Sequence, residues 1–260
     1  LQISAALEEY ANDDPTQPTA SAAKTEGGYA LSGTKICVSQ ATTARRILLS
    51  ARNGDELVVA LIDPRAAGIE LTPQVVTSGE TLHELAMNSV QVPDEDIIAV
   101  GAKALEAMQW AQQATRTALC AMMVGLADKM MRTTGSYTTE REQFGRPIAT
   151  FQAVSHRVAD CYIDVECLSL VTEQAVSLID QSRPAEEAVL IAKIWCGDTA
   201  HRVSQASQHC HGGPGVDRDY PLHRYCMHAR QIELSLGNSA QLNAQLGSRI
   251  AREYLAASQA

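Results

Sequence analysis

The spacing of the apolar residues changes once along the chain, close to Gly101, and this change limits the possible folds more than any other feature. From Thr25 to about Ile98, short β-type runs are separated by turn signals such as Asn53-Gly54 and Asp63-Pro64. After Gly101 the apolar residues recur at helical spacing, at Leu105, Met108, Ala111, Ala118, Met122 and Leu126. Because strands have a period of two and helices a period of 3.6, the chain must join a β part to a helical part.

The β part is predicted to contain strands at 29–38, 46–51, 57–62, 69–76 and 82–92. Short strands at this spacing are typical of a small antiparallel barrel or sandwich. The first 24 residues are polar and contain Pro15 and Pro18, which favours a loop after a short helical turn. We therefore expect a lead-in segment over 1–24, held in place by other residues, and a β domain over 25–100.

The helical part is predicted to contain helices at about 102–140, 151–182, 184–209, 222–234 and 239–257. Four or five long helices with short connections make a bundle. The predicted fold class is therefore α+β, in which a small antiparallel β barrel or sandwich is followed by a four-helix-bundle domain over 101–260.

Composition excludes several classes of partner. A net charge of −9 and a pI near 5.3 supply no basic surface for nucleic acid or anionic lipid. The seven cysteines are scattered, odd in number and mostly within apolar helical patterns, which is typical of reduced core residues. The sequence has no apolar run long enough for a membrane span and no signal-peptide pattern near its start. We expect a cytoplasmic protein.

Six histidines and cysteines lie within twenty residues, at His209, Cys210, His211, His223, Cys226 and His228. These residue types can bind zinc, but their spacing matches no closed zinc site. The first three are consecutive at a helix end, so their side chains point in different directions. We predict no metal site.

Two ordered motifs lie in the helical part. Residues 141–152 read Arg-Glu-Gln-Phe-Gly-Arg-Pro-Ile-Ala-Thr-Phe-Gln, residues 211–215 read His-Gly-Gly-Pro-Gly, and residues 220–224 read Tyr-Pro-Leu-His-Arg. With the order of β and helical parts, these motifs resemble the acyl-CoA dehydrogenase family over nearly the whole chain. The resemblance implies the middle and C-terminal domains of that family, without its N-terminal helical domain.

The β part also resembles this family. Residues 28–35 look like its Gly-Tyr-x-Leu-x-Gly-x-Lys hairpin, and residues 90–93 look like the strand that closes the β domain. Where typical members carry a Trp and then a Thr beside the flavin ring, this chain has Cys37 and Ser39. Ser39 could still donate a hydrogen bond to the flavin, whereas Cys37 cannot cover it as an indole does.

The resemblance implies FAD as the cofactor, bound partly by the first motif. Arg141 carries a planar donor fork that suits pyrophosphate oxygens. Phe144 offers an apolar face to an adenosine, and Gly145 is expected to end the helix. Ile148 and Phe151 would extend the same apolar wall.

The glycine motif is expected to meet the FAD of a neighbouring subunit. Gly212 and Gly213 let the backbone approach a phosphate or ribose with no side chain in the way. The residue that matches a glutamine of the family is His209, or Gln208 if the alignment slips by one position. Either side chain can donate a hydrogen bond.

The carboxylate that removes the substrate proton is missing from both positions where the family places it. The usual position holds Leu236, in Leu-Gly-Asn, and the alternative holds Thr115, directly before an arginine. Neither side chain can accept the proton. Glu233 is the nearest carboxylate in sequence, but we expect an ion-paired or solvated helix residue rather than a relocated base. Asp217 is a weaker candidate, so no catalytic residue is assigned.

Three interpretations follow from the resemblance. In the first, the chain is a subunit of an α2β2 acyl-CoA dehydrogenase of the kind that acts on steroid side-chain CoA thioesters, and a partner subunit supplies the catalytic glutamate. In the second, it is a self-sufficient homotetramer with a displaced base. In the third, it is a scaffold that binds no flavin. The first is preferred, and it implies an acyl-CoA substrate and an electron-transfer acceptor.

Overall fold

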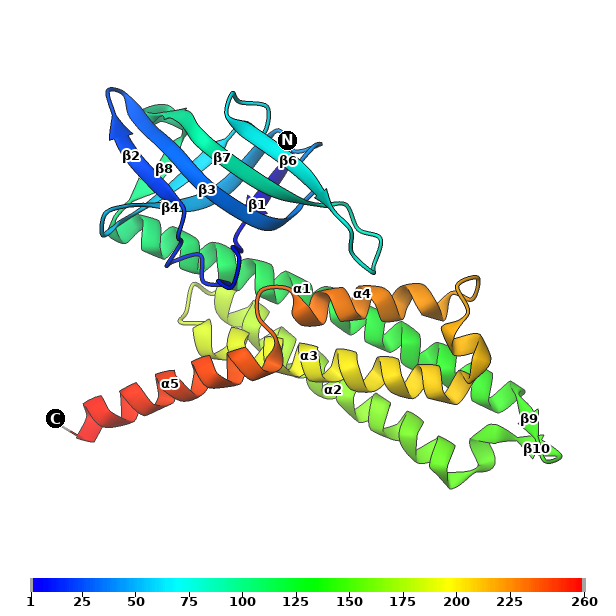
Figure 1. The fold of residues 1–260 in the computed structure, drawn as a ribbon. Helices are drawn as coiled ribbons and strands as arrows, with labels where there is room; N and C mark the ends of the chain where they lie inside the picture. Colours follow the sequence, from blue (N-terminus) through cyan, green and yellow to red (C-terminus); the bar gives the residue numbers. More distant parts are fainter. Residues whose placement is uncertain (1, 259–260) are drawn as a thin grey trace. The chain divides into compact units, whose positions relative to one another are not determined.

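The computed structural model describes residues 2–258 of the 260-residue chain (Figure 1). The chain forms two compact units that divide between Gln112 and Gln113, inside helix α1 (Ala102–Glu140). The first turns of α1 belong to the sheet unit, where the side-chain amide of Gln112 donates to the backbone carbonyl of Asp13 at 3.1 Å. The division therefore lies beyond Gly101, although the period of the sequence changes there.

The sheet unit contains one sheet of eight strands. Their order is β6-β7-β3-β2-β4-β5-β8, with β1 also paired to β4. The strands span Ile3–Ala6 (β1), Ser21–Thr25 (β2), Gly28–Ser39 (β3), Arg46–Asn53 (β4), Glu56–Ile62 (β5), Ile69–Gln74 (β6), Leu82–Pro93 (β7) and Ile97–Val100 (β8). The strands β1 and β2 run parallel to β4, and the other pairs are antiparallel. A mixed sheet unit followed by helices confirms the predicted α+β class.

Alternation along the strands forms the core of the sheet unit. In β4 the fully buried residues Ile47, Leu49 and Ala51 alternate with half-buried or polar neighbours, as a strand period of two requires. In β5, Leu57, Val58, Val59 and Ala60 form a continuous buried run. Such a run indicates a strand covered on both faces.

The loop predicted at the start of the lead-in segment is wrong for β1, and β2 begins inside this segment at Ser21 and ends at Thr25. Their sequences carry few β-branched residues, and pairing with distant strands decides their conformation: Ile3 pairs with Arg46, and Ala22 with Leu31. The expected anchor exists as well. The buried carboxylate of Glu9 accepts a hydrogen bond from Lys35 Nζ at 2.7 Å.

The helical unit contains the five predicted helices. Besides α1 they are α2 (Gln152–Asp180), α3 (Glu186–His211), α4 (Leu222–Leu234) and α5 (Ser239–Ser258). Figure 1 shows α2 and α3 lying side by side. The shared core consists mainly of small and sulfur-containing side chains, among them Cys120, Met123, Ala127, Met130, Ala192, Cys196 and Ala200. Small residues let helices approach closely, and methionines fill the irregular gaps that remain.

All seven cysteines are free thiols, and four of them are buried. Burial raises the pKa of Cys226 to about 11, so this thiol stays protonated at neutral pH. Within the described residues, no helix is both long enough and apolar enough to cross a membrane.

Candidate functional site

The motif that begins at Arg141 forms a short hairpin directly after α1. Helix α1 ends at Glu140, and Glu142–Gln143 (β9) pairs with Arg146–Pro147 (β10). The prediction that Gly145 ends the helix is wrong. Gly145 and Phe144 are the two turn residues of the hairpin, with φ of 76° and 55°. Both central residues of such a turn take positive φ, which matches the twist of a hairpin.

The Phe144 ring stands out from the surface at the tip of this hairpin. Its residue is 92% exposed, and its ring meets the Phe151 ring edge-on, with centroids 6.1 Å apart. The Arg146 guanidinium lies 4.2 Å from the centre of the Phe151 ring. A left-handed conformation costs a non-glycine residue about 1 kcal/mol. The hairpin therefore holds an apolar ring in solvent at a cost in backbone strain.

Backbone hydrogen bonds fix the position of Arg141. Its N–H donates to the carbonyl of Tyr137 in the last turn of α1 at 2.8 Å, and its carbonyl accepts from the N–H of Ile148 at 2.8 Å. The side chain is exposed and forms no ion pair within the described residues. Two backbone hydrogen bonds therefore hold Arg141 at the start of the hairpin, where its side chain is exposed.

The glycine motif forms the turn after α3. Gly212 ends the helix with φ 65° and ψ −134°, and Gly213–Val216 forms the short 3-10 helix η3. A methyl group added at Gly212 or Gly213 would meet no atom within 4 Å, so the outer face of the turn is open. A methyl group on Gly215 would lie 2.6 Å from the carbonyl oxygen of Gln208, so this glycine is needed for packing.

The structure brings the last turns of α1, before the hairpin, into contact with the end of α3, before the glycine turn. The His211 ring, directly before Gly212, stacks on the Tyr137 ring with centroids 4.2 Å apart. His209 is exposed one turn back, near the end of α3, and Gln208 is half-buried. Sequence reasoning missed Tyr137, because nothing in its local pattern shows that it faces the end of another helix.

Ser39 belongs to the sheet unit, at the end of β3, where its carbonyl accepts a hydrogen bond from the Ser4 hydroxyl. Cys37 has a φ of 56°, and its N–H donates to the side-chain oxygen of Gln74 at 2.8 Å. A bulge between β3 and β7 falls at this point, because two residues of β3 have no paired partner there.

The residues around the hairpin and the glycine turn fit an adenine dinucleotide. A guanidinium without an ion pair in the described structure suits a pyrophosphate, and an exposed aromatic ring suits adenine. The open backbone at Gly212 and Gly213 leaves room for a phosphate or ribose. FAD contains each of these groups.

Arg116 links the helix that carries Thr115 to the turn that carries Leu236, the two positions expected for the missing base. The buried side chain of Arg116, which follows Thr115 on α1, donates from Nε to the carbonyl of Leu236 at 3.0 Å. Leu236 is 4% exposed and has a φ of 55°. At both positions the fold is kept without a proton-accepting side chain.

A second buried cation holds the same turn. Lys193, on α3, is fully buried, and its Nζ donates to the carbonyls of Ile232 at 3.0 Å, Glu233 at 3.2 Å and Gly237 at 3.1 Å. These carbonyls belong to the end of α4 and the turn that follows. An ammonium group has three donors, so the three bonds use its full capacity.

Glu233 serves a different part of the surface. Its carboxylate forms an ion pair with Arg230 one turn earlier on α4. It lines a groove of about 450 Å³ together with His201, Ser239 and residues around them, but Leu236 is not among the lining residues. Asp217 is exposed and accepts a hydrogen bond from the N–H of Asp219.

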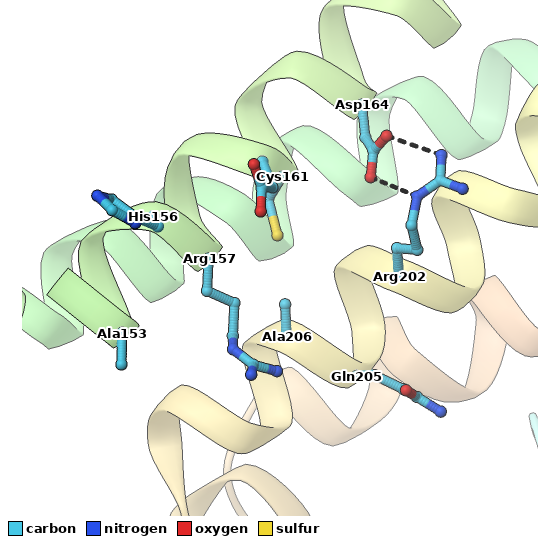
Figure 2. Close-up of a pocket in the computed structure, with 9 residues that line it drawn as sticks. Ala153, His156, Arg157, Cys161, Asp164, Arg202, Gln205 and Ala206 are labelled. Carbon is cyan, nitrogen blue, oxygen red and sulfur yellow. Dashed lines mark hydrogen bonds and ion pairs between the residues drawn. The ribbon is translucent and has the colours of Figure 1, made fainter.

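A polar groove of about 380 Å³ lies between α2 and α3 (Figure 2). Asp164 and Arg202 face each other across it in a bidentate ion pair, with both N–O distances at 2.7 Å. Arg157 extends from α2 toward α3 in the same view. Paired charges do not suit an acyl chain, which needs an apolar chamber. Within the described residues, no group of three His, Cys, Asp or Glu side chains is placed to hold a metal ion.

The chain is similar to known proteins over most of its length. The family model described as the acyl-CoA dehydrogenase C-terminal domain matches residues 105–251. Acyl-CoA dehydrogenase FadE27 of Mycobacterium tuberculosis is 31% identical over 257 residues, which are 96% of this chain and 67% of the relative. FadE28 of the same organism is 30% identical over 250 residues, 95% of this chain and 69% of the relative.

Solved structures share the fold. The Tcur3481-Tcur3483 steroid ACAD matches with a TM-score of 0.89 and 37% identity, covering 97% of this chain and 68% of that one. The ChsE4-ChsE5 complex from Mycobacterium tuberculosis matches with a TM-score of 0.87 and 31% identity, covering 96% of this chain and 66% of that one. The chain thus spans about two thirds of the length of these relatives.

The family model covers more than half of the chain, and FadE27 matches almost all of it. The motifs at the hairpin and at the glycine turn lie inside the matched region. Members of the matched family are FAD flavoproteins that oxidise a CH–CH bond of an acyl-CoA thioester. The chain belongs to the acyl-CoA dehydrogenase family.

Proposed function

We propose that this chain is the subunit of a hetero-oligomeric acyl-CoA dehydrogenase that lacks the catalytic base. It contributes contacts to FAD and part of the oligomer core, while a partner subunit of the same family supplies the catalytic carboxylate. The observation that carries this proposal is that neither 115 nor 236 holds a base, although Arg116, directly after Thr115, still bonds the carbonyl of Leu236. An intact nucleotide motif at Arg141 accompanies this loss.

The residues of the chain hold the cofactor rather than react with the substrate. Arg141 binds the pyrophosphate of FAD, and Phe144 covers its adenine. Gly212 and Gly213 let the backbone approach the dinucleotide, and Ile148, Phe151 and His209 complete the surface around it. FAD, when bound, supplies the hydride acceptor. Ser39 donates a hydrogen bond on the flavin side from the sheet unit.

The turn at Leu236 stays in place without a catalytic side chain. Arg116 and Lys193 hold its carbonyls from two helices, so the backbone geometry does not depend on the residue at 236. Proton abstraction requires a carboxylate within hydrogen-bond reach of the substrate. Glu233 already pairs with Arg230, and we assign the proton transfer to the partner subunit.

The substrate class follows from the relatives. One matched structure is named a steroid ACAD, and two matched structures are named as pairs of different proteins. We assign to this chain an α2β2 assembly and a CoA thioester of a steroid side chain as substrate. An electron-transfer acceptor would be the further partner of this assembly.

Purification of the tagged chain, alone and with the subunit it captures from its host, tests this function. We expect a colourless protein alone and a complex with flavin absorbance that oxidises acyl-CoA thioesters. A yellow, active preparation of the chain alone would show a self-sufficient enzyme. A complex that never retains flavin would leave only a scaffold role.

A further inference from the structure

His211 is a buried histidine between two aromatic rings at the end of α3. It is 3% exposed, and it stacks on Tyr137 at a centroid distance of 4.2 Å and an interplanar angle of 22°. The Tyr220 ring also contacts His211, with the ring centroids 5.3 Å apart and the ring planes at 52° to each other. Tyr137 comes from the last turns of α1, and Tyr220 from the segment between η3 and α4. One side chain of α3 therefore contacts two other parts of the helical unit, the end of α1 and the segment before α4.

The hydrogen bonds of His211 define its chemical state. Its Nδ1 lies 2.8 Å from the carbonyl oxygen of Ser207, which can only accept, so Nδ1 carries the hydrogen. Burial lowers the pKa of His211, and the neutral ring then leaves Nε2 with a lone pair. Nε2 is shielded from solvent and has no hydrogen-bond partner among the described residues. A sealed nitrogen of this kind cannot reach a ligand, a metal ion or a substrate proton.

A continuous series of contacts joins His211 to the backbone of Arg141. The Tyr137 hydroxyl donates to the carbonyl of His211 at 3.3 Å. The carbonyl of Tyr137 accepts the N–H of Arg141 at 2.8 Å. On the other side, His211 is followed directly by Gly212, whose N–H donates to the carbonyl of Gln208 at 3.0 Å. The ring thus lies between the two segments that would hold the dinucleotide.

We propose that His211 is a positioning residue that fixes the glycine turn relative to the Arg141 hairpin. The side chain combines two functions. Its ring stacks on Tyr137 and meets the Tyr220 ring at a tilt, and its Nδ1–H ties that ring to the preceding turn of α3. Phenylalanine would stack without donating, and leucine would do neither. The consequence for nucleotide binding rests on the proposed function, whereas the fixing of the two segments does not.

Hydrogen exchange of the flavin-free chain, measured by mass spectrometry, tests whether His211 couples the glycine turn to the Arg141 hairpin. In His211→Leu, we expect exchange to rise about tenfold in 141–148 and 212–220 together, because both lose the shared ring. His211→Phe, which keeps the stack, should restore most of the protection in both segments. His201→Leu changes an exposed histidine of the same helix and should leave both segments as in the wild type.

A second variant removes only the hydrogen bond. Tyr137→Phe keeps the ring and loses the hydroxyl that donates to His211, so exchange should rise at Arg141 and Gly212 by a smaller factor. This variant carries the test if His211→Leu does not fold. A rise confined to one of the two segments, or no rise in either, would overturn the coupling.

Flavin retention by the complex with the captured partner separates this inference from the proposed function. We expect the His211→Leu complex to lose flavin faster than the wild-type complex during gel filtration. A wild-type complex that never holds flavin refutes the proposed function, while the exchange experiment still decides the coupling. Retained flavin with unchanged exchange in His211→Leu refutes the coupling alone.

Discussion

Buried cations are the residues on which the helical unit most depends. Lys193 is enclosed, and three backbone carbonyls surround its Nζ. Arg116 adds a fourth carbonyl contact to the same region through Leu236. Buried charge is tolerated only when its donors are used, and the carbonyls of the turn use them here.

Lys193→Met should therefore destabilise the protein strongly. The substitution keeps the length of the side chain but leaves three carbonyls without their donor, and we expect a loss of about 3 kcal/mol of unfolding free energy. Lys129→Met, at an exposed position of α1, is the matched control and should change stability by less than about 0.5 kcal/mol. Urea unfolding followed by circular dichroism measures both, and equal stabilities for the two variants would contradict the role of Lys193.

The stability of the folded protein depends on pH through Glu9. Burial alone would raise its pKa, but hydrogen bonds from Lys35 and Thr19 outweigh burial and lower the pKa below its usual 4.5. The folded state therefore releases this proton more readily than the unfolded state does. The resulting stability is present above about pH 4.5 and is lost as the pH falls through the lowered pKa.

Glu9→Gln tests this contribution, because it removes the carboxylate and leaves the Lys35 charge buried without a counter-ion. We expect a loss of about 3 kcal/mol at pH 6 and a flatter fall in stability between pH 6 and pH 3. Glu26→Gln, at an exposed position before β3, should keep the wild-type slope. Parallel slopes for Glu9→Gln and wild type would show that Glu9 does not titrate in this way.

At the scale of elements, the two glycines after α3 have different requirements. Gly212 occupies a conformation open only to glycine, with φ 65° and ψ −134°. Gly213 lies outside that region and has free space around its Cα. The turn therefore needs the first glycine for its backbone, whereas the second matters only if a ligand comes close.

Gly212→Ala and Gly213→Ala form a matched pair. Gly212→Ala should cost about 1–3 kcal/mol of stability through backbone strain. Gly213→Ala should change stability by less than about 0.5 kcal/mol but weaken flavin retention by the complex, because its methyl group points into the space of the dinucleotide. Thermal unfolding and flavin release measure the two effects. Unchanged flavin retention in Gly213→Ala would remove this turn from the binding surface.

The spacing of apolar residues predicted the long helices and strands. The local sequence did not predict turns whose conformation depends on contacts with distant residues. All five helices and the strands from β3 to β7 lie close to the ranges expected from their apolar spacing. The hairpin turn was missed because phenylalanine at a left-handed position opposes its own preference. The bond between Arg116 and Leu236 joins residues 120 positions apart, and no local pattern encodes such a contact.

The sequence motifs predicted membership of the acyl-CoA dehydrogenase family, and the comparisons with known proteins confirm it. The assignment of Arg141, Phe144, Gly212 and Gly213 to the cofactor remains a prediction. The structure adds residues that carry no motif signal, namely Tyr137, His211 and Lys193. Their roles depend on burial and on partners from other helices, which appear only in the fold.

At the scale of the whole molecule, α2 leaves large apolar side chains in solvent. Tyr162, Ile163, Leu170 and Val176 are each exposed by 46% or more. Ile163 and Leu170 are seven residues apart, so they lie on one face of the helix. Exposed apolar residues grouped on an element indicate an interface with another chain.

The double variant Ile163→Ser and Leu170→Ser should weaken assembly without unfolding the chain. Both side chains are exposed, so we expect wild-type thermal stability, less aggregation of the isolated chain and a smaller yield of the complex with the captured partner. Val75→Ser removes a fully exposed apolar residue of the sheet unit and is the control. Light scattering and pull-down yield are the measurements. Assembly equal to that of the wild type would place the interface elsewhere.

The carbonyl bonds of Arg116 and Lys193 also bear on how such a subunit can arise. Since these bonds hold main-chain atoms, the side chain at 236 can change while the turn keeps its shape. After a gene duplication, one copy can thus lose its base by a single substitution and still fold and assemble. Under the proposed function, catalysis is then a property of the pair, so that selection would act on the two genes together.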